Sequence, residues 1–249
     1  MIENINNIIR NWLLEAAEIC RTFPREALDV SEKSPGHKVT ALDFTIDRFL
    51  KKNIRALFPD HQIVSEEGND LINSESPYTW LLDPIDGTSY LIQGLQAYSV
   101  VIMLFKNDSP FAVGIINPET NSYWVATNDC FESHMPNINR LDFKGKLLAS
   151  PNYKCKSSLL TLNVHPVGSI AYRACLGVCC DSLGVLSLQN LSSWDFLPAT
   201  FIAQSKGFCV SDLDGNPLVC SLKDTKAKSR GLIITKTNEL ESILKWIHV

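Results

Sequence analysis

The sequence Trp80-Leu-Leu-Asp-Pro-Ile-Asp-Gly-Thr88 joins a short apolar run to two aspartates, a proline, a glycine and a threonine. The apolar run predicts a buried strand. Asp83 and Asp86 are costly beside such a strand unless their negative charge is balanced. A plain turn is the alternative, because Asp, Pro and Gly all favour turns. The rest of the chain must show which interpretation holds.

Other acidic residues occupy comparable places along the chain. Asp43 lies in a segment of helical periodicity, the pair Glu66-Glu67 ends a predicted strand, and Asp195 follows Trp194. Because strand ends converge in a sheet, we expect these carboxylates to gather. Gathered carboxylates repel one another unless hard divalent cations with oxygen ligands neutralise them. The sequence therefore predicts a magnesium site, whose positive charge would let an acidic protein hold an anionic phosphate.

The residues between and after the two aspartates fit a phosphate site. Pro84 stiffens the turn, and Gly87 lets the backbone come close to a ligand. Thr88 supplies a hydroxyl, and the amides of Gly87, Thr88 and Ser89 are expected to face a phosphate if residues 89–93 form a helix. A calcium loop of the EF-hand type is not expected, because the two aspartates and the glycine fall at the wrong offsets for that motif.

Length and composition bound the class of protein. The chain has 249 residues, 45% of them hydrophobic, with a formal net charge of −4 and a pI near 5.7. It is long enough for one compact body or two packed lobes. Without a dense Lys/Arg run, neither a nucleic-acid polymer nor a membrane is expected as a partner. The start of the chain lacks the basic-then-apolar order of a secretory signal, so we expect a cytoplasmic protein.

The eight cysteines are scattered among apolar neighbours and show no paired C-x-x-C spacing. This pattern favours reduced, small buried side chains over disulfides. Cys175, Cys179 and Cys180 share a helical stretch, but a structural zinc site needs four ligands and no second half is present.

Periodicity and turn residues divide the chain into two parts. Residues 1–145 are expected to form an α+β lobe with an antiparallel sheet and most of the metal ligands, and residues 146–249 an α/β lobe that supplies Asp195 and substrate contacts. In the first lobe we expect helices over 5–19 and 40–58, a polar loop over 31–38, strands at 62–65 and 78–82, and a meander over 98–127. In the second lobe we expect strands at 147–150, 185–188 and 231–235, helices over 170–179, 195–206 and 240–247, and a turn at 214–217.

Three acidic segments together resemble the signature set of the inositol monophosphatase family, a branch of the lithium-sensitive, magnesium-dependent phosphatases. They are Ser65-Glu66-Glu67-Gly68, Asp83-Pro84-Ile85-Asp86-Gly87-Thr88 and Trp194-Asp195. Val39-Thr-Ala-Leu-Asp43 and Val167-Gly-Ser-Ile-Ala171 resemble two further family segments. The matches keep the family order, so the resemblance covers the fold. It implies a layered α/β/α/β/α sandwich, like that of fructose-1,6-bisphosphatase, and a homodimer.

Carried over by position, the resemblance implies roles for individual residues. Glu66, Asp83 and the backbone carbonyl of Ile85 would hold one Mg²⁺, and Asp83, Asp86 and Asp195 a second, with a third, weaker ion near Glu66. Glu66, Thr88 and Asp43 would be catalytic, the latter two by helping to activate the attacking water, while Glu67 and Lys33 would lie in an outer shell. Substrate contacts would come from Asp86, Gly87, Thr88, Ser89, Gly168, Ser169 and Asp195.

Two of these residues, and a lone histidine elsewhere in the chain, have simpler interpretations. Thr40 and Asp43 have the spacing of a capping box, so Asp43 could serve the helix start alone. Glu67 could be only a solvated neighbour of Glu66. His165 has no partner in sequence, which favours a packed or exposed role.

The expected function is magnesium-dependent hydrolysis of a small polyol or sugar phosphate, with inositol 1-monophosphate as the leading substrate. Inositol-specific members tend to carry an acidic residue shortly before Trp-Asp, whereas residues 185–193 here contain none. A site without that charged acceptor should hold inositol less firmly. A 3'(2'),5'-bisphosphate nucleotidase, which shares the metal ligands, is the enzymatic alternative. A non-catalytic relative that binds or regulates a partner is the alternative from another class.

Overall fold

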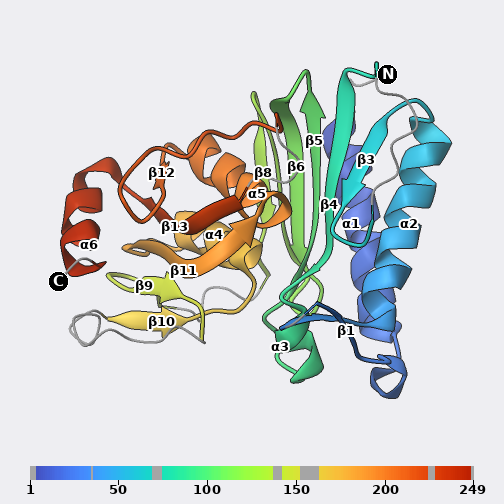
Figure 1. Cartoon of the computed structure of the whole chain (residues 1–249), viewed down its shortest axis with the longest axis horizontal. Helices are drawn as coiled ribbons and strands as arrows, with labels where there is room; N and C mark the ends of the chain where they lie inside the picture. The colour runs from blue at the N-terminus through green and yellow to red at the C-terminus, as the bar shows by residue number, and fades with distance from the viewer. Residues whose placement is uncertain are drawn as a thin grey trace. The chain divides into compact units, whose positions relative to one another are not determined.

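The computed structural model describes residues 4–34, 36–68, 75–136, 142–151, 163–223 and 228–247. The chain divides into two compact units, residues 1–136 and 137–249. The division lies close to the boundary after residue 145 that the sequence predicts. Each unit has its own β-sheet and its own helices (Figure 1).

The first unit is built on a six-stranded sheet with the strand order β3-β4-β5-β6-β7-β8. Only the β3–β4 pair is parallel, and the other pairs form the antiparallel meander that the turn residues predict. Strand β8 was not expected. The strands are β3 (Gln62–Ser65), β4 (Tyr78–Asp86), β5 (Ser99–Lys106), β6 (Ser109–Asn117), β7 (Ser122–Thr127) and β8 (Phe131–His134).

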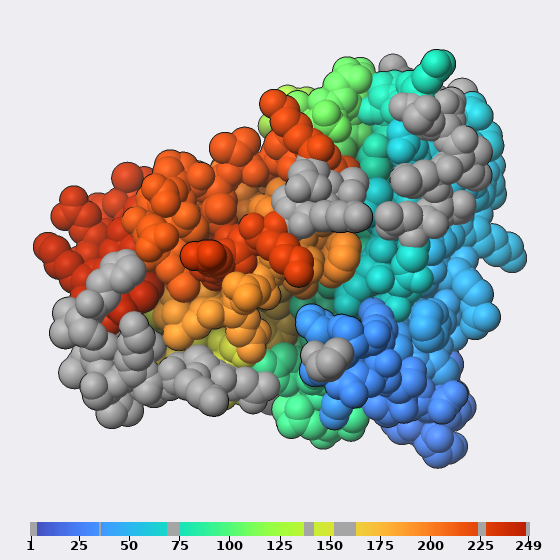
Figure 2. Space-filling view, in the orientation of Figure 1, coloured from blue at the N-terminus to red at the C-terminus, as the bar shows by residue number. Residues whose placement is uncertain are grey.

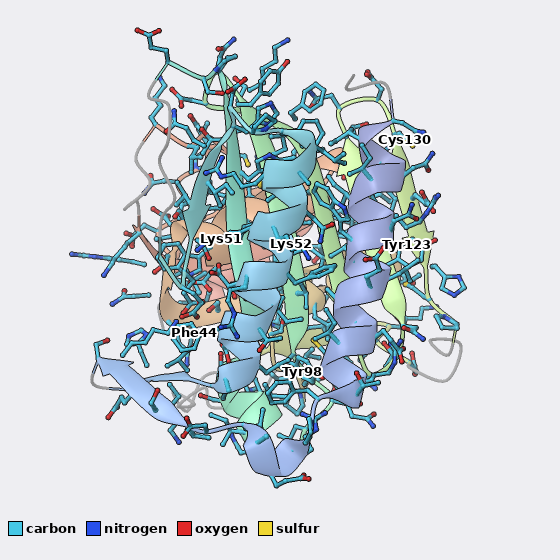
Figure 3. The ribbon with its side chains drawn as sticks, turned by 90° about the vertical axis from the view of Figure 1, so that its right-hand side faces the viewer. Phe44, Lys51, Lys52, Tyr98, Tyr123 and Cys130 are labelled. Atoms are coloured by element: carbon cyan, nitrogen blue, oxygen red, sulfur yellow. The ribbon has the colours of Figure 1, made fainter. Side chains whose placement is uncertain are left out.

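Two long helices pack against this sheet, α1 (Ile5–Thr22) and α2 (Ala41–Leu57), as the apolar periodicity predicts (Figure 3). Their apolar stripes share one buried cluster with inward residues of β3 to β7. At Gly114 of β6 a Cβ atom would lie 2.2 Å from Ile9 Cγ2 and 2.7 Å from Leu13 Cδ1. Glycine is therefore needed for α1 to approach the sheet this closely.

The predicted polar loop over residues 31–38 is wrong. Strands β1 (Ser31–Ser34) and β2 (His37–Val39) pair antiparallel as a small separate hairpin. All four residues of β1 are exposed, and the hairpin belongs to the blue part of the surface in Figure 2. An exposed ribbon shows no alternation of apolar and polar residues, so the pattern that identifies strands was missing. The 3₁₀ helix η1 (Arg25–Ala27) precedes it.

The second unit contains a five-stranded mixed sheet with the order β10-β9-β11-β13-β12. Strands β10, β9 and β11 run parallel, and β13 pairs antiparallel with both β11 and β12. Strand β10, which contains His165, was not expected. The strands are β9 (Leu147–Ala149), β10 (Val164–Pro166), β11 (Gly184–Ser192), β12 (Cys209–Ser211) and β13 (Lys228–Thr235).

Helices cover both faces of this second sheet. Gly177 of α4 (Ile170–Cys179) lies against Val185 of β11, so closely that a Cβ there would be 2.3 Å from Val185 Cγ2. Leu186, on the opposite face of β11, packs with Ile243 of α6 (Leu240–Ile247). Helix α5 (Ser193–Ser205) begins two residues earlier than predicted, which places Pro198 beyond the first turn of the helix. The 3₁₀ helix η4 (Thr237–Glu239) leads into α6.

Sheets and helices in both units confirm the predicted mixed α/β class. In the described part of the chain, no helix combines the length and apolar character needed to cross a membrane. The cysteines in that part carry free thiols; Cys20, Cys175 and Cys220 are buried and Cys130 is exposed, while Cys155 lies outside the described residues.

Candidate functional site

The end of β4 presents two buried carboxylates, with Asp83 only 1% and Asp86 only 7% exposed. Asp83 pairs with Val101 of β5 and Asp86 with Ser99, so β4 has one residue more than β5 between these pairs. Side chains alternate along a regular strand, and an offset of three would place the two aspartates on opposite faces. The extra residue is a β-bulge that restores them to the same face. A plain turn does not explain this geometry.

The chain changes direction directly after these aspartates. Gly87 has φ +94°, a left-handed conformation that glycine adopts without strain, and it precedes the short helix α3 (Thr88–Ile92). The phosphate contact predicted for these amides required a helix over residues 89–93. That helix is present, and it begins one residue before Ser89. The Thr88 hydroxyl lies 3.0 Å from the carbonyl oxygen of Ile85 and 3.0 Å from Asp43 Oδ1. Thr88 therefore connects the end of β4 with the start of α2.

Asp43 serves the helix start and the site at once. Its Oδ2 accepts hydrogen bonds from the amide, at 2.9 Å, and the hydroxyl of Thr40, which forms the predicted capping box. Its Oδ1 contacts Thr88. Burial raises the pKa of Asp43, while the hydrogen bonds from Thr40 and Thr88 act in the opposite direction. The two interpretations of Asp43 are not exclusive, because each carboxylate oxygen has its own partner.

Glu66 and Glu67 lie in the turn after β3, and the same lysine side chain pairs with both. Lys33 Nζ, on β1, lies 3.1 Å from Glu66 Oε1 and also forms an ion pair with Glu67. The Glu67 side chain is 1% exposed, so the interpretation of Glu67 as a solvated neighbour is wrong. Burial raises the pKa of Glu67 to about 7, although Lys33 opposes this shift. Burial alone would lower the pKa of Lys33, but the two glutamates outweigh it and raise that pKa.

In the second unit, the predicted residues lie at the starts of two helices. Asp195 Oδ2 accepts a 2.7 Å hydrogen bond from the amide of Ser192 and caps α5. Ser169, which follows Gly168, caps α4 by accepting a 3.0 Å hydrogen bond from the amide of Tyr172. Both residues thus have a structural role within their own unit.

The oxygen-rich donor set of the first unit fits a hard divalent cation. Glu66, Asp83 and Asp86 offer carboxylates, and Ile85 offers its backbone carbonyl oxygen. The Thr88 hydroxyl occupies one lone pair of that oxygen, and the second lone pair remains for a metal ion. Mg²⁺ prefers such ligands. Burying two carboxylates on one strand face is unfavourable for their charged forms, and a bound cation would offset that cost. These residues therefore fit the predicted magnesium site.

Sequence reasoning missed two polar residues of α2 near this site. Asp47 is buried, and Lys51 forms an ion pair with it at 2.7 Å. Neither residue belongs to a segment of the family resemblance. The sequence did contain one signal for them. Asp47 is followed four residues later by Lys51, so this acid and base share the side of the predicted helix that is otherwise buried.

Comparison with known sequences agrees with the predicted family. Residues 1–245 match the sequence model of the family described as the inositol monophosphatase family. The Nus factor SuhB of Xylella fastidiosa is 26% identical over 207 residues, which cover 76% of this chain and 74% of that protein. The inositol-1-monophosphatase of Bacillus subtilis is 33% identical over 105 residues, which cover 41% of this chain and 40% of that protein.

Solved structures of similar fold come from proteins of low sequence identity. An IMPase/NADP phosphatase complexed with Mg²⁺ and phosphate superimposes with a TM-score of 0.80 at 17% identity, over 98% of this chain and 95% of that one. A staphylococcal inositol monophosphatase-1 in a lithium chloride inhibitory complex gives 0.78 at 18% identity, over 99% and 95%. At these identities the likeness shows the fold, and it confirms the fold that the sequence predicts.

Proposed function

Because the chain belongs to the inositol monophosphatase family, we propose that it is a magnesium-dependent phosphomonoesterase acting on a small polyol or sugar phosphate. Family membership supports a metal-dependent phosphatase in general. The observation that carries the proposal is the bulged end of β4, where Asp83 and Asp86 share a face and Thr88 contacts Asp43. A strand end that only turned the chain would need neither the buried carboxylates nor this contact.

In the proposed site, Glu66, Asp83 and the Ile85 carbonyl would hold one Mg²⁺, and Asp83, Asp86 and Asp195 would hold a second. A third, weaker ion would bind near Glu66. When bound, Mg²⁺ supplies positive charge that neutralises the carboxylates, attracts the phosphate and makes water more acidic. The oxygen donor set described above supports this assignment.

Thr88 and Asp43 form a path for a proton. The Thr88 hydroxyl, 3.0 Å from Asp43 Oδ1, can donate its hydrogen to that oxygen while one of its lone pairs accepts a proton from the attacking water. Water then displaces the alcohol from phosphorus in line; the departing alkoxide takes a proton from solvent water, and Asp43 returns its proton to solvent, which restores the site. Holding the reacting groups in position suits the loose transition state of phosphoryl transfer.

Substrate contacts are proposed from both units. The amides of Gly87, Thr88 and Ser89 at the start of α3 would bind the phosphate, together with Asp86. Gly168 and Ser169 at the start of α4, and Asp195, would contact the rest of the substrate. Inositol 1-monophosphate is the proposed substrate, and a homodimer is the proposed assembly.

A panel of phosphate esters tests the substrate. Phosphate release would be measured with Mg²⁺ and with EDTA for inositol 1-monophosphate, a sugar phosphate and adenosine 3',5'-bisphosphate. We expect Mg²⁺-dependent release, fastest from inositol 1-monophosphate and inhibited by lithium. Release from the nucleotide alone would assign the alternative, a bisphosphate nucleotidase.

A binding or regulatory role is a second candidate, because several similar proteins bear the name of a factor, Nus factor SuhB. The same panel separates the two functions. No turnover on any ester with Mg²⁺, alongside a stable complex with a protein partner, would favour the second candidate over the enzyme.

A further inference from the structure

A polar cluster on α2 lies next to the turn that carries Glu66. Asp47 is 5% exposed, and its Oδ1 accepts a 2.6 Å hydrogen bond from the hydroxyl of Ser65, the last residue of β3. Its Oδ2 forms the 2.7 Å ion pair with Lys51 Nζ, one helical turn further along α2. We call Asp47, Lys51 and Ser65 the α2 brace. Figure 3 shows α2 with Lys51 and its exposed neighbour Lys52 labelled.

The α2 brace contacts the backbone of the two residues that follow Glu66. The hydroxyl of Ser65 accepts a hydrogen bond from the amide of Glu67 at 3.2 Å. Lys51 Nζ donates a 2.8 Å hydrogen bond to the carbonyl oxygen of Gly68. The backbone directly after Glu66 is therefore contacted by Lys51 of α2 and by the Ser65 hydroxyl, which Asp47 of α2 holds in place.

The backbone of the turn has further fixed points. The Gly68 amide donates to the Ser65 carbonyl oxygen at 3.2 Å, and the Glu66 amide donates to the Leu82 carbonyl oxygen of β4 at 3.1 Å. The second bond connects the start of the turn to the strand that ends in Asp83 and Asp86. The position of the Glu66 backbone relative to these aspartates is thus set by the sheet and by the α2 brace together.

The charges of the α2 brace also matter. Asp47 and Lys51 form a neutral pair, so the brace adds no net charge beside the carboxylates of the turn. A largely buried ion pair contributes little net stability, because removing both charges from water offsets most of their attraction. The ion pair instead fixes a geometry, because the buried charge of Asp47 is neutralised only while Lys51 stays in place.

We propose that the α2 brace is a positioning device that holds the Glu66 carboxylate in the orientation in which it binds Mg²⁺. The inference rests on the proposed function. Replacing a residue that orients a metal ligand without itself contacting the metal commonly weakens metal affinity 10–100-fold. A brace that merely fastened β3 to α2 would affect stability and leave metal affinity unchanged.

The test compares two neighbouring lysines of α2. Lys51→Met removes the contacts to Asp47 and Gly68 and keeps most of the apolar stem. Lys52→Met is the matched control, because Lys52 is exposed and has no hydrogen bond or ion pair within the described residues. Metal affinity would be measured by titration with Mn²⁺, following the free ion by electron paramagnetic resonance. Urea unfolding in EDTA would report stability without metal.

We expect Lys51→Met to weaken Mn²⁺ binding roughly 10-fold or more, with wild-type affinity in Lys52→Met. Lys51→Arg, which keeps the charge and donors, should recover part of the affinity. Ser65→Ala should weaken binding in the same direction and carries the test if Lys51→Met does not fold.

Two results would overturn the inference in distinguishable ways. Wild-type Mn²⁺ affinity in Lys51→Met and Ser65→Ala, with reduced stability, would make the brace purely structural and leave the proposed function intact. Failure of the wild-type protein itself to bind Mn²⁺ and to release phosphate would overturn the proposed function, and the inference with it.

Discussion

Each unit contains a tight turn that follows a strand and carries acidic residues, but the two turns are held differently. In the second unit, Asp212 follows β12 and accepts hydrogen bonds from the amides of Asp214 and Asn216, at 2.9 and 2.8 Å, and from the Asn216 side chain at 3.0 Å. Every partner lies within a few residues of Asp212. This acidic residue stabilises its own turn.

In the first unit, the turn Ser65–Gly68 depends on distant elements. Lys33 of β1 pairs with its glutamates, and the α2 brace contacts its backbone. The pKa values differ accordingly. Burial raises the pKa of Glu67 to about 7, whereas at Asp212 hydrogen bonds from Asn216, Asp214 and Gly215 outweigh burial and lower the pKa. A turn that only reverses the chain is satisfied locally, whereas a turn that presents carboxylates for binding is held from outside.

The largest expected effect is on activity in the externally held turn. Glu66→Gln removes a proposed Mg²⁺ ligand, and we expect phosphate release to fall roughly 1,000-fold, by analogy with the loss of one strong electrostatic contact to a transition state. Urea unfolding should show a stability equal to or above that of the wild type, since one of several neighbouring negative charges is gone. Undiminished phosphate release in this variant would remove Glu66 from the site.

The next effect concerns the connection between β4 and α2. Thr88→Val keeps the shape of the side chain but removes the hydroxyl that contacts Asp43, so we expect a roughly 100-fold lower kcat. Because Asp43 still caps α2 through Thr40, the change in unfolding free energy should be small. A variant with wild-type kcat would show that this hydroxyl is not part of a proton path.

The locally satisfied turn should respond in the opposite way. Asp212→Ala removes the hydrogen bonds that its carboxylate accepts at a partly exposed turn, and we expect the free energy of unfolding to fall by about 1 kcal/mol, with unchanged phosphate release. Asp214→Ala is the control, since the exposed Asp214 takes part through its backbone amide. A large loss of activity in Asp212→Ala would break the distinction between the two turns.

The smallest effect is a pH dependence of that stability difference. The pKa of Asp212 is lower in the folded protein than its ordinary value near 3.8, so its stabilisation is present above about pH 4 and is lost as the pH falls through the folded pKa. The difference in unfolding free energy between wild type and Asp212→Ala should therefore be constant from pH 5 to 7 and shrink below pH 4. A difference that grows on acidification would contradict the assignment.

The same contrast explains what could be predicted from the sequence. The turn at Asp214–Pro217 was predicted from its own residues, and the structure bridges Ser211 to Pro217 across it. The capping pair Thr40–Asp43 and the strands that end near Glu66 and Asp86 were also accessible, because their signals are local.

The contacts that complete the site join residues far apart in the sequence, so no local sequence pattern predicts them. Lys33 and Glu66 are 33 positions apart, and the sequence connected them only through the family resemblance. The bond between Ser65 and Asp47 spans 18 positions and was missed, although the Asp47–Lys51 spacing was visible. The β-bulge that turns Asp83 and Asp86 to one face depends on pairing with β5, which periodicity within β4 does not reveal.

The proposed metal site is tested most directly by an anomalous difference map from crystals soaked with Mn²⁺ and inorganic phosphate. We expect ions bound to Glu66, Asp83, the Ile85 carbonyl and Asp86, with Asp195 completing the set and phosphate beside Thr88. A well-ordered map with no ion at these carboxylates, or with Asp195 directed elsewhere, would contradict it.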